Sequence, residues 1–304
     1  MQHAARRVAG GLVLLLALTS ILSSCEPSVL RVADYRLDTE LPRGLLDEAP
    51  IYRVVEAPTP AADWARHVAA ALGFEGEPVD YSEAAAQPAW TWAGRLHSGK
   101  SVEVDGNIAF QGSPLDGDTG ASTIETAEEA VAAARAWLTA RDLLPADCAD
   151  DARAWPYQTG PDESRLTRHG WEVCFRRRLD GLPVGSRCVW RGGISLRLDT
   201  QGHVTFITHV RREVEMDSLV PIKTVDEAWQ ELQRRGPAFF DAFPRLPEYG
   251  IFTITEVALG YYEGPVGTAE VQRQFKPHYI FTGRAEIPNG GGEARVAAYV
   301  PAWK

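Results

Sequence analysis

The sequence predicts an α+β fold built from repeated antiparallel sheet-plus-helix modules. Alternating strand-turn-strand segments occur at 101–110 and at 195–206, each with a polar turn that contains Asp and Gly. A Thr-x-x-Glu capping box follows each of them, at Thr126–Glu129 and at Thr224–Glu227. In such a box the two side chains satisfy the free N–H groups of a helix start. The shared order of strands, turn and cap indicates at least two copies of one unit.

The N-terminus carries a signal for export and lipidation. Arg6 and Arg7 precede the apolar run Val8–Leu22, which is short for a membrane span and suits the hydrophobic part of a signal peptide. The motif Leu-Ser-Ser-Cys, which ends at Cys25, resembles the lipobox of bacterial lipoproteins. That resemblance implies cleavage before Cys25 and its acylation, which places the protein on the extracytoplasmic side of the cell membrane. An ordinary cleaved signal peptide and an uncleaved anchor are the alternatives.

Charge and composition restrict the partners. The chain has 31 basic and 41 acidic residues, a net charge of −10, which disfavours a general affinity for nucleic acid. Removal of residues 1–24 deletes two basic residues and no acidic one, so the mature charge is −12. Anionic lipid headgroups repel such a domain, so we expect only the lipid anchor to contact the membrane.

The expected elements divide the chain into four parts. Residues 1–24 are the signal peptide, and 25–58 are the lipidated Cys and a tether that ends in a strand at 51–55. Residues 59–145 are the first sheet-plus-helix module. Residues 150–304 are the second module, completed by C-terminal closing strands.

Three further features of the first module have competing interpretations. A helix is expected from Thr59, a good N-cap, to Gly73. Trp90 and Trp92 share one strand face and form either part of the core or a sugar-binding shelf, of which the core is favoured. Asp116–Gly120 is interpreted as a turn, because a calcium loop needs further ligand positions and a closing Glu.

Two of the cysteines that follow the lipobox flank a predicted hairpin. Strands at 171–179 and 183–190, joined by a three-residue loop, place Cys174 opposite Cys188, which permits a cross-strand disulfide. The equally weighted alternative is that both are small buried residues that never meet. Cys148 is then left over, although thiols outside the cytoplasm tend to pair.

The sequence predicts no catalytic residue, no cofactor and no metal. It lacks the Gly-x-Ser-x-Gly, P-loop and His-Glu-x-x-His motifs. His203 and His209 share a strand face and form a candidate ligand set with His278, but solvated histidines are the commoner explanation. Arg176–Arg178 alternates between two faces of a strand, so it is interpreted as a solvated, charged sheet edge.

Short motifs in the second half of the chain resemble a known family. They are Arg178–Val184, Leu196–Asp199, Gly202–Val204, Val220–Ala228, Leu259–Tyr262, Pro277–Phe281 and Tyr299–Ala302. The first four resemble PepSY-like modules, and the last three resemble the closing strands of YycI-like proteins. Tandem modules of this kind occur in the extracytoplasmic parts of YycH/YycI-type regulators of two-component kinases. The resemblance covers about residues 51–304 and implies a PepSY-like fold and a regulatory role.

These observations favour a non-catalytic interaction module. We expect a membrane-tethered protein that binds a protein or peptide in the envelope by adding a strand to an open sheet edge, and by resemblance modulates a sensor kinase. The candidate edges are the strands at Trp171–Leu179 and Arg295–Pro301. The alternative is a cell-envelope enzyme or cell-wall-glycan-binding lipoprotein with a site built from dispersed residues, which a deep pocket with convergent titratable groups would favour.

Overall fold

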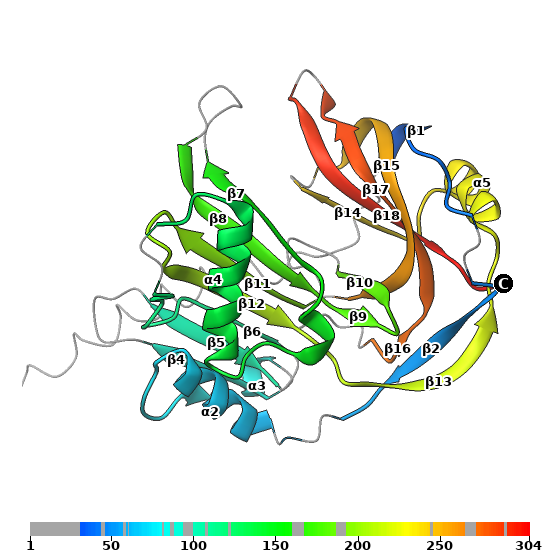
Figure 1. The fold of residues 1–304 in the computed structure, drawn as a ribbon. Helices are drawn as coiled ribbons and strands as arrows, with labels where there is room; N and C mark the ends of the chain where they lie inside the picture. Colours follow the sequence, from blue (N-terminus) through cyan, green and yellow to red (C-terminus); the bar gives the residue numbers. More distant parts are fainter. Residues whose placement is uncertain are drawn as a thin grey trace, which may run out of the picture.

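Strands dominate the structure, a computed structural model, and form an eight-stranded sheet, a seven-stranded sheet and a three-stranded ribbon that joins them (Figure 1). The predicted α+β fold of repeated PepSY-like modules is therefore wrong. The protein is β-rich, and its strands form large sheets rather than repeated units of one sheet and one helix. The structure describes residues 31–304 apart from 44–45, 57–58, 60, 81, 86–87, 94–99, 107–108, 121–122, 160–166, 187–192, 244–245, 265–271 and 289–290.

The eight-stranded sheet is antiparallel, in the order β3-β4-β5-β6-β12-β11-β8-β7. Helices α2 and α4 pack on it and bury a continuous apolar core that includes Val68, Trp92 and Trp137. The elements of this part are α2 (Ala61–Ala71), β3 (Val79–Asp80), α3 (Ser82–Ala85), β4 (Ala89–Ala93), β5 (Ser101–Asp105), β6 (Ala109–Gly112), α4 (Ala127–Thr139), η1 (Ala146–Cys148), β7 (Ala152–Thr159), β8 (Thr167–Arg176), β11 (Gly193–Asp199) and β12 (Val204–Val210).

The sequence repeat corresponds to two neighbouring hairpins rather than to two modules. Hairpins β5–β6 and β11–β12 lie side by side, because β6 pairs antiparallel with β12 and places Phe110 opposite His209. Both hairpins therefore turn their alternating apolar residues towards one common core. Strands from both sides of the 145–150 boundary share this sheet.

The seven-stranded sheet has the order β14-β18-β17-β15-β10-β9, with β1 parallel to β15. Helix α5 packs on it and buries Ala228 and Leu232. Strand β1 lies within the segment expected to be a tether. The elements are β1 (Arg31–Leu37), β9 (Arg178–Leu179), β10 (Leu182–Ser186), α5 (Val225–Arg235), β14 (Phe239–Phe243), β15 (Glu248–Glu263), β17 (Pro277–Glu286) and β18 (Glu293–Pro301).

Both predicted capping boxes are confirmed. The Thr126 hydroxyl accepts from the Glu129 N–H at 3.2 Å, and the Glu129 carboxylate accepts from the Thr126 N–H at 3.0 Å. Thr224 and Glu227 repeat this exchange at the start of α5, with distances of 3.2 and 2.7 Å. The two helices belong to different sheets, so this local signal is correct although the sheets around it are not copies of one unit.

The predicted hairpin around Asp180 is divided between the two sheets. Strand β8 stays in the eight-stranded sheet, whereas β10 pairs with β15. Asp180 and Gly181 both have positive φ, 47° and 80°, so they form a two-residue turn of the kind that favours Asp-Gly. Leu179 consequently faces Leu182, so the expected register of a three-residue loop is wrong by one residue.

The ribbon consists of β2 (Glu48–Val54), β13 (Val214–Pro221) and β16 (Gln274–Phe275), in the order β13-β2-β16. Strand β2 corresponds to the strand expected at 51–55. In Figure 1 the long pair β2–β13 runs from the eight-stranded sheet to the region of α5, with β13 on the outside.

Candidate functional site

Neither of the strands expected to form an open sheet edge does so over most of its length, although the two residues of β9 (Arg178–Leu179) end the seven-stranded sheet. Strand β8, which covers most of 171–179, lies between β7 and β11, and β18, which covers 295–301, lies between β14 and β17. Position in the chain was a poor guide, because each of them pairs on one side with the strand that precedes it and on the other side with a strand more distant in the sequence.

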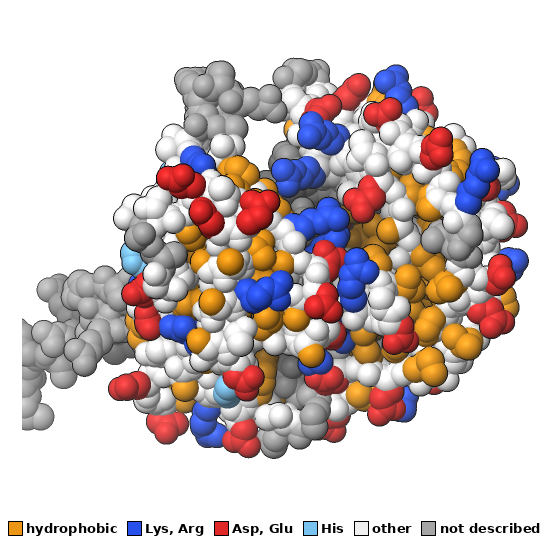
Figure 2. Space-filling model, in the orientation of Figure 1, with side chains coloured by type: hydrophobic (Ala, Val, Ile, Leu, Met, Phe, Trp, Pro, Cys, Tyr) orange, Lys and Arg blue, Asp and Glu red, His pale blue; other side chains and the backbone are white. Residues whose placement is uncertain are grey.

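Strand β13 is an open edge, as are β3, β7, β9 and β14 at the ends of the two larger sheets, and it stands out because it carries two exposed large apolar side chains. Within the described residues β13 pairs with β2 on one side and with no strand along its other side, which faces outwards in Figure 1. The side chains of Met216 and Leu219 are 63% and 58% exposed. Figure 2 shows hydrophobic side chains gathered at the lower right, over the region of β2 and β13. An unpaired edge with exposed apolar side chains is ready to accept another strand.

A β-bulge interrupts the alternation of β13. Met216 lies opposite Tyr52 and Ser218 lies opposite Ile51, so Asp217 is an extra residue with no partner position on β2. Side chains of a regular strand alternate between its two faces, and one inserted residue reverses that alternation beyond the bulge.

The bulge places the apolar side chains of β13 on one face. Without it, Met216 and Leu219 would point to opposite faces, because their sequence separation is odd. With it, Val214, Met216 and Leu219 share the face on which Tyr52 of β2 is buried. The result is an apolar stripe along the open edge.

The same three residues direct their backbone groups away from β2. The Val55 N–H donates to the Glu213 carbonyl at 3.0 Å, and the Ile222 N–H donates to the Asp47 carbonyl at 2.9 Å. Peptide groups alternate in direction along a strand, so these two bonds and the one-residue bulge fix the orientation of every residue between them. The N–H and C=O groups of the stripe therefore point to the open edge.

The C-terminal residues limit this open stretch. The Lys304 N–H donates to the Pro221 carbonyl at 3.2 Å, and Trp303 forms an isolated bridge with Ile222. These contacts lie on the outer side of the chain, at the last residue of β13 and at the residue that follows it. The part that remains open is accordingly 214–220, which we call the β13 edge.

The β13 edge is acidic. Strand β13 carries Glu215 and Asp217 and no basic residue. Glu215 pairs with Arg53 of β2 at 2.9 Å, and both side chains are about 60% exposed, so solvent screens this pair.

Val214, at the N-terminal end of the β13 edge, packs against a buried cluster that includes Tyr52 and Tyr261, whose rings meet edge to face. The ribbon is thereby anchored on the seven-stranded sheet.

A buried ionic cluster lies where the two sheets and β13 meet. Arg177, 1% exposed, contacts Asp147 at 2.9 Å and Glu263 at 3.6 Å. Arg212 lies 3.5 Å from Glu263, which is 0% exposed and also accepts the Arg212 N–H at 3.0 Å. Arg211 contacts Asp147 at 3.2 Å. We call these five residues the junction cluster.

Burial and the neighbouring charges shift the pKa values of the two carboxyl groups in the junction cluster in opposite directions. Burial raises the pKa of Glu263 above that of an ordinary carboxyl, although the guanidiniums of Arg177 and Arg212 oppose this rise. Burial also raises the pKa of Asp147, but the guanidiniums of Arg177 and Arg211 outweigh it, so its net shift is downwards. The interpretation of Arg176–Arg178 as a solvated edge is therefore wrong for Arg177.

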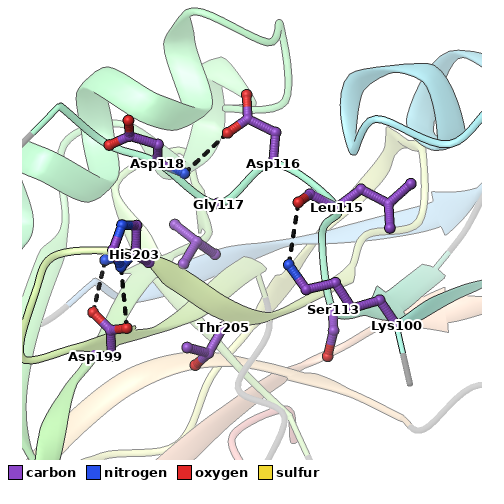
Figure 3. A pocket seen from close by; sticks show the side chains of 10 residues that line it. Lys100, Ser113, Leu115, Asp116, Gly117, Asp118, Asp199, His203 and Thr205 are labelled. Atoms are coloured by element: carbon purple, nitrogen blue, oxygen red, sulfur yellow. Dashed lines mark hydrogen bonds and ion pairs between the residues drawn. The ribbon is translucent and has the colours of Figure 1, made fainter. Parts of the chain in front are cut away.

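A shallow hollow of about 540 Å³ lies beside β12, and Figure 3 shows its lining. Its acidic side chains already form hydrogen bonds or contacts with nearby groups of the same chain. Asp116 accepts the Asp118 N–H at 3.1 Å, Asp118 accepts the Gly120 N–H at 2.8 Å, and Asp199 lies 3.2 Å from His203 Nδ1. These bonds support the turn interpretation of 116–120. No group of three or more potential metal ligands occurs in the part of the chain that the structure describes.

The remaining candidate residues are dispersed. His203 is exposed, whereas His209 and His278 are buried in different sheets. Burial lowers the pKa of His209 to about 3 and that of His278 to about 4. Trp90 and Trp92 both pack in the core of the eight-stranded sheet, which confirms that interpretation.

The cysteines are only partly within the described residues. Cys25 and Cys188 lie outside them. Cys174 is buried on β8, where Ser195 and Arg153 are its cross-strand neighbours. A disulfide with Cys188 stays a prediction. Cys148 is buried at η1, and burial raises the pKa of its thiol.

Comparison with known proteins defines the fold and nothing more specific. No family model matches the sequence, and no curated protein matches it. One solved structure of similar fold is an uncharacterized protein from Eubacterium rectale, with a TM-score of 0.50 and 12% sequence identity over 88% of this chain and 87% of that chain. None of the helices in the described residues combines the length and apolarity of a membrane span.

Proposed function

We propose that the protein is a lipid-anchored, extracytoplasmic binding module that captures an extended segment of a partner protein by strand addition to the β13 edge. The observation that carries this proposal is the coincidence of two features in Val214, Met216 and Leu219. Their backbone groups face the open edge, and their apolar side chains line one face beside it.

The two features supply different parts of recognition. Backbone hydrogen bonds add affinity without depending on the partner's sequence, and the side chains along the edge select among extended segments. The ribbon is already ordered by β2 and by the cluster around Tyr52, so the binding surface is preorganised and less entropy is lost on association.

The N-terminal motif supports the location of this activity. Acylation of Cys25 would hold the domain at the outer surface of the cell membrane, within reach of other envelope proteins. The resemblance to YycH/YycI-type regulators makes the extracytoplasmic part of a sensor kinase the first partner to examine.

Site-specific crosslinking in intact cells tests the proposal. A photoreactive residue replaces Leu219, with or without the second change Met216→Pro, which removes one outward N–H that β2 does not use. Proline is tolerated where the N–H faces solvent at a sheet edge. We expect a defined adduct from position 219 whose yield Met216→Pro reduces about tenfold.

The matched control places the same photoreactive residue at Val79, an apolar residue on β3 that is 65% exposed at the end of the eight-stranded sheet. It should give no such adduct. The proposal fails if positions 79 and 219 give the same adducts, or if the yield of the adduct at 219 is unchanged by Met216→Pro in a protein of unchanged melting temperature.

A further inference from the structure

We infer that the segment captured by the β13 edge alternates apolar and basic residues, with apolar side chains opposite Val214 and Met216 and a basic side chain opposite Glu215. This inference rests on the proposed function and specifies its ligand. Residues opposite each other in a β-ladder place their side chains on the same face, so the pattern of β13 dictates a complementary pattern in its partner.

The apolar half of the pattern follows from the stripe. Val214 packs on the cluster that includes Tyr52 and Val54, whereas Met216 beside it is 63% exposed. An apolar side chain added opposite Met216 extends this cluster and removes the exposed surface from water. A polar side chain at that position would leave the surface hydrated.

The basic positions of the expected pattern follow from the side chains on the other face of β13. Glu215 points to the face opposite the stripe, and Asp217 lies exposed at the bulge. Two basic residues lie nearby. Arg53 forms an ion pair with Glu215, and Lys304 lies beside Pro221, beyond the open stretch. Opposite charges across a ladder stabilise pairing, whereas like charges destabilise it.

The same charges disfavour a second copy of this chain as the occupant. Antiparallel pairing of two β13 edges would bring Glu215 and Asp217 of each copy close to the same acids of the other. The repulsion acts as a guard against self-association, which an open edge requires. A basic segment converts that repulsion into attraction, and the mature charge of −12 steers it towards the protein.

Three short peptides with blocked ends test the inference. Each alternates valine with a second residue, which is lysine, serine or glutamate, and binding to the full chain in detergent micelles is followed by fluorescence anisotropy. We expect the lysine peptide to bind about tenfold or more tightly than the glutamate peptide, with the serine peptide between them. Salt should reduce the difference.

Two variants locate the effect. Glu215→Gln combined with Asp217→Asn should weaken the lysine peptide several-fold and leave the serine peptide unchanged. The control Glu128→Gln, an exposed acid on α4 that takes no part in the capping box, should change neither. Met216→Pro should weaken all three peptides, by about tenfold, because each loses one backbone hydrogen bond.

The outcomes separate this inference from the proposed function. Equal affinity for the lysine and serine peptides, with both lost in Met216→Pro, overturns the charge pattern and leaves strand addition standing. Two further outcomes would assign the binding to general acidity and overturn both the inference and the proposed function. One is tight binding of the lysine peptide that Met216→Pro does not affect, and the other is an equal loss of affinity in the Glu128→Gln control. Absence of binding by all three peptides also overturns both.

Discussion

The junction cluster and the β13 edge both invert the usual distribution of side chains, in opposite ways. At the junction, Arg177 and Glu263 are charged groups with almost no exposure, whereas along β13 the apolar side chains of Met216 and Leu219 are more than half exposed. Soluble proteins rarely bury charges without partners and rarely cluster apolar groups on an open edge.

The difference lies in whether the unusual groups are satisfied within the chain. The carboxylate of Glu263 has two guanidiniums within 3.6 Å and accepts a backbone N–H, so the buried charges of the junction are paired within the chain, although Glu263 Oε2 and Arg177 Nη1 lack a hydrogen bond among the described residues. The outward-facing backbone groups of Val214, Met216 and Leu219 have no strand partner among the described residues. Arg211, Arg212 and Glu213 alone separate β12 from β13 and thus link the junction cluster to the β13 edge.

The largest effect on stability is expected from Glu263→Gln. This change leaves the buried Arg212 without a counter-charge and leaves Arg177 with Asp147 alone, which should lower the free energy of unfolding by about 3–5 kcal/mol. Urea denaturation measures the loss. Glu215→Gln removes an exposed partner of Arg53 and should cost only about 0–1 kcal/mol. Similar losses in the two variants would contradict the distinction between junction and edge.

Acid should destabilise the protein through its buried histidines. His209 and His278 have pKa values of about 3 and about 4 in the folded state, both below the ordinary value of 6.5. Since the unfolded chain then binds protons first, stability is lost as the pH falls below 6.5 and declines until the folded pKa is reached. The slope is about 1.4 kcal/mol per pH unit for each histidine.

The variant His209→Leu separates the contribution of one histidine. Both ring nitrogens of His209 lack a hydrogen bond among the described residues, and its ring lies 5.1 Å from that of Phe110. Leucine should therefore raise stability at neutral pH and reduce the acid slope measured by thermal melts between pH 4 and pH 7. An unchanged slope would mean that His209 does not titrate as described.

The smallest effect on stability is expected at the β13 edge. Met216→Ser should change the free energy of unfolding by less than about 0.5 kcal/mol, because the side chain is mostly exposed in the folded protein. The same variant should bind the valine–lysine peptide more weakly. Val79→Ser, at a position of similar exposure, serves as the control for both measurements. A large loss of stability in Met216→Ser alone would make the stripe a structural feature.

The sequence allowed the local features of the fold to be predicted, but not the pairing of its strands. The capping boxes at Thr126 and Thr224 depend on residues three positions apart, and the apolar positions of Trp92 and Trp137 depend on periodicity within one element. The pairing of β6 with β12 joins residues about 100 positions apart, and no periodicity indicates it.

The apolar stripe of the β13 edge was hidden in the sequence for a related physical reason. In 214–219 the extra residue Asp217 breaks the alternation that marks a strand, so apolar residues on one face look irregular in the sequence. The junction cluster escaped prediction because Arg177 and Glu263 are 86 positions apart, and an arginine triplet usually marks a solvated surface. A local signal for β13 was the pair Val214 and Met216, which alternates with two acids.

Amide hydrogen exchange with and without the valine–lysine peptide tests strand addition most directly. In the free protein the amides of Val214, Met216 and Leu219 should exchange quickly, because they face the open edge, while that of Glu215 is protected by β2. Strand addition predicts that saturating peptide protects the three fast amides and leaves Glu215 unchanged. Saturation of the peptide site with no change at Val214, Met216 and Leu219 would contradict the account.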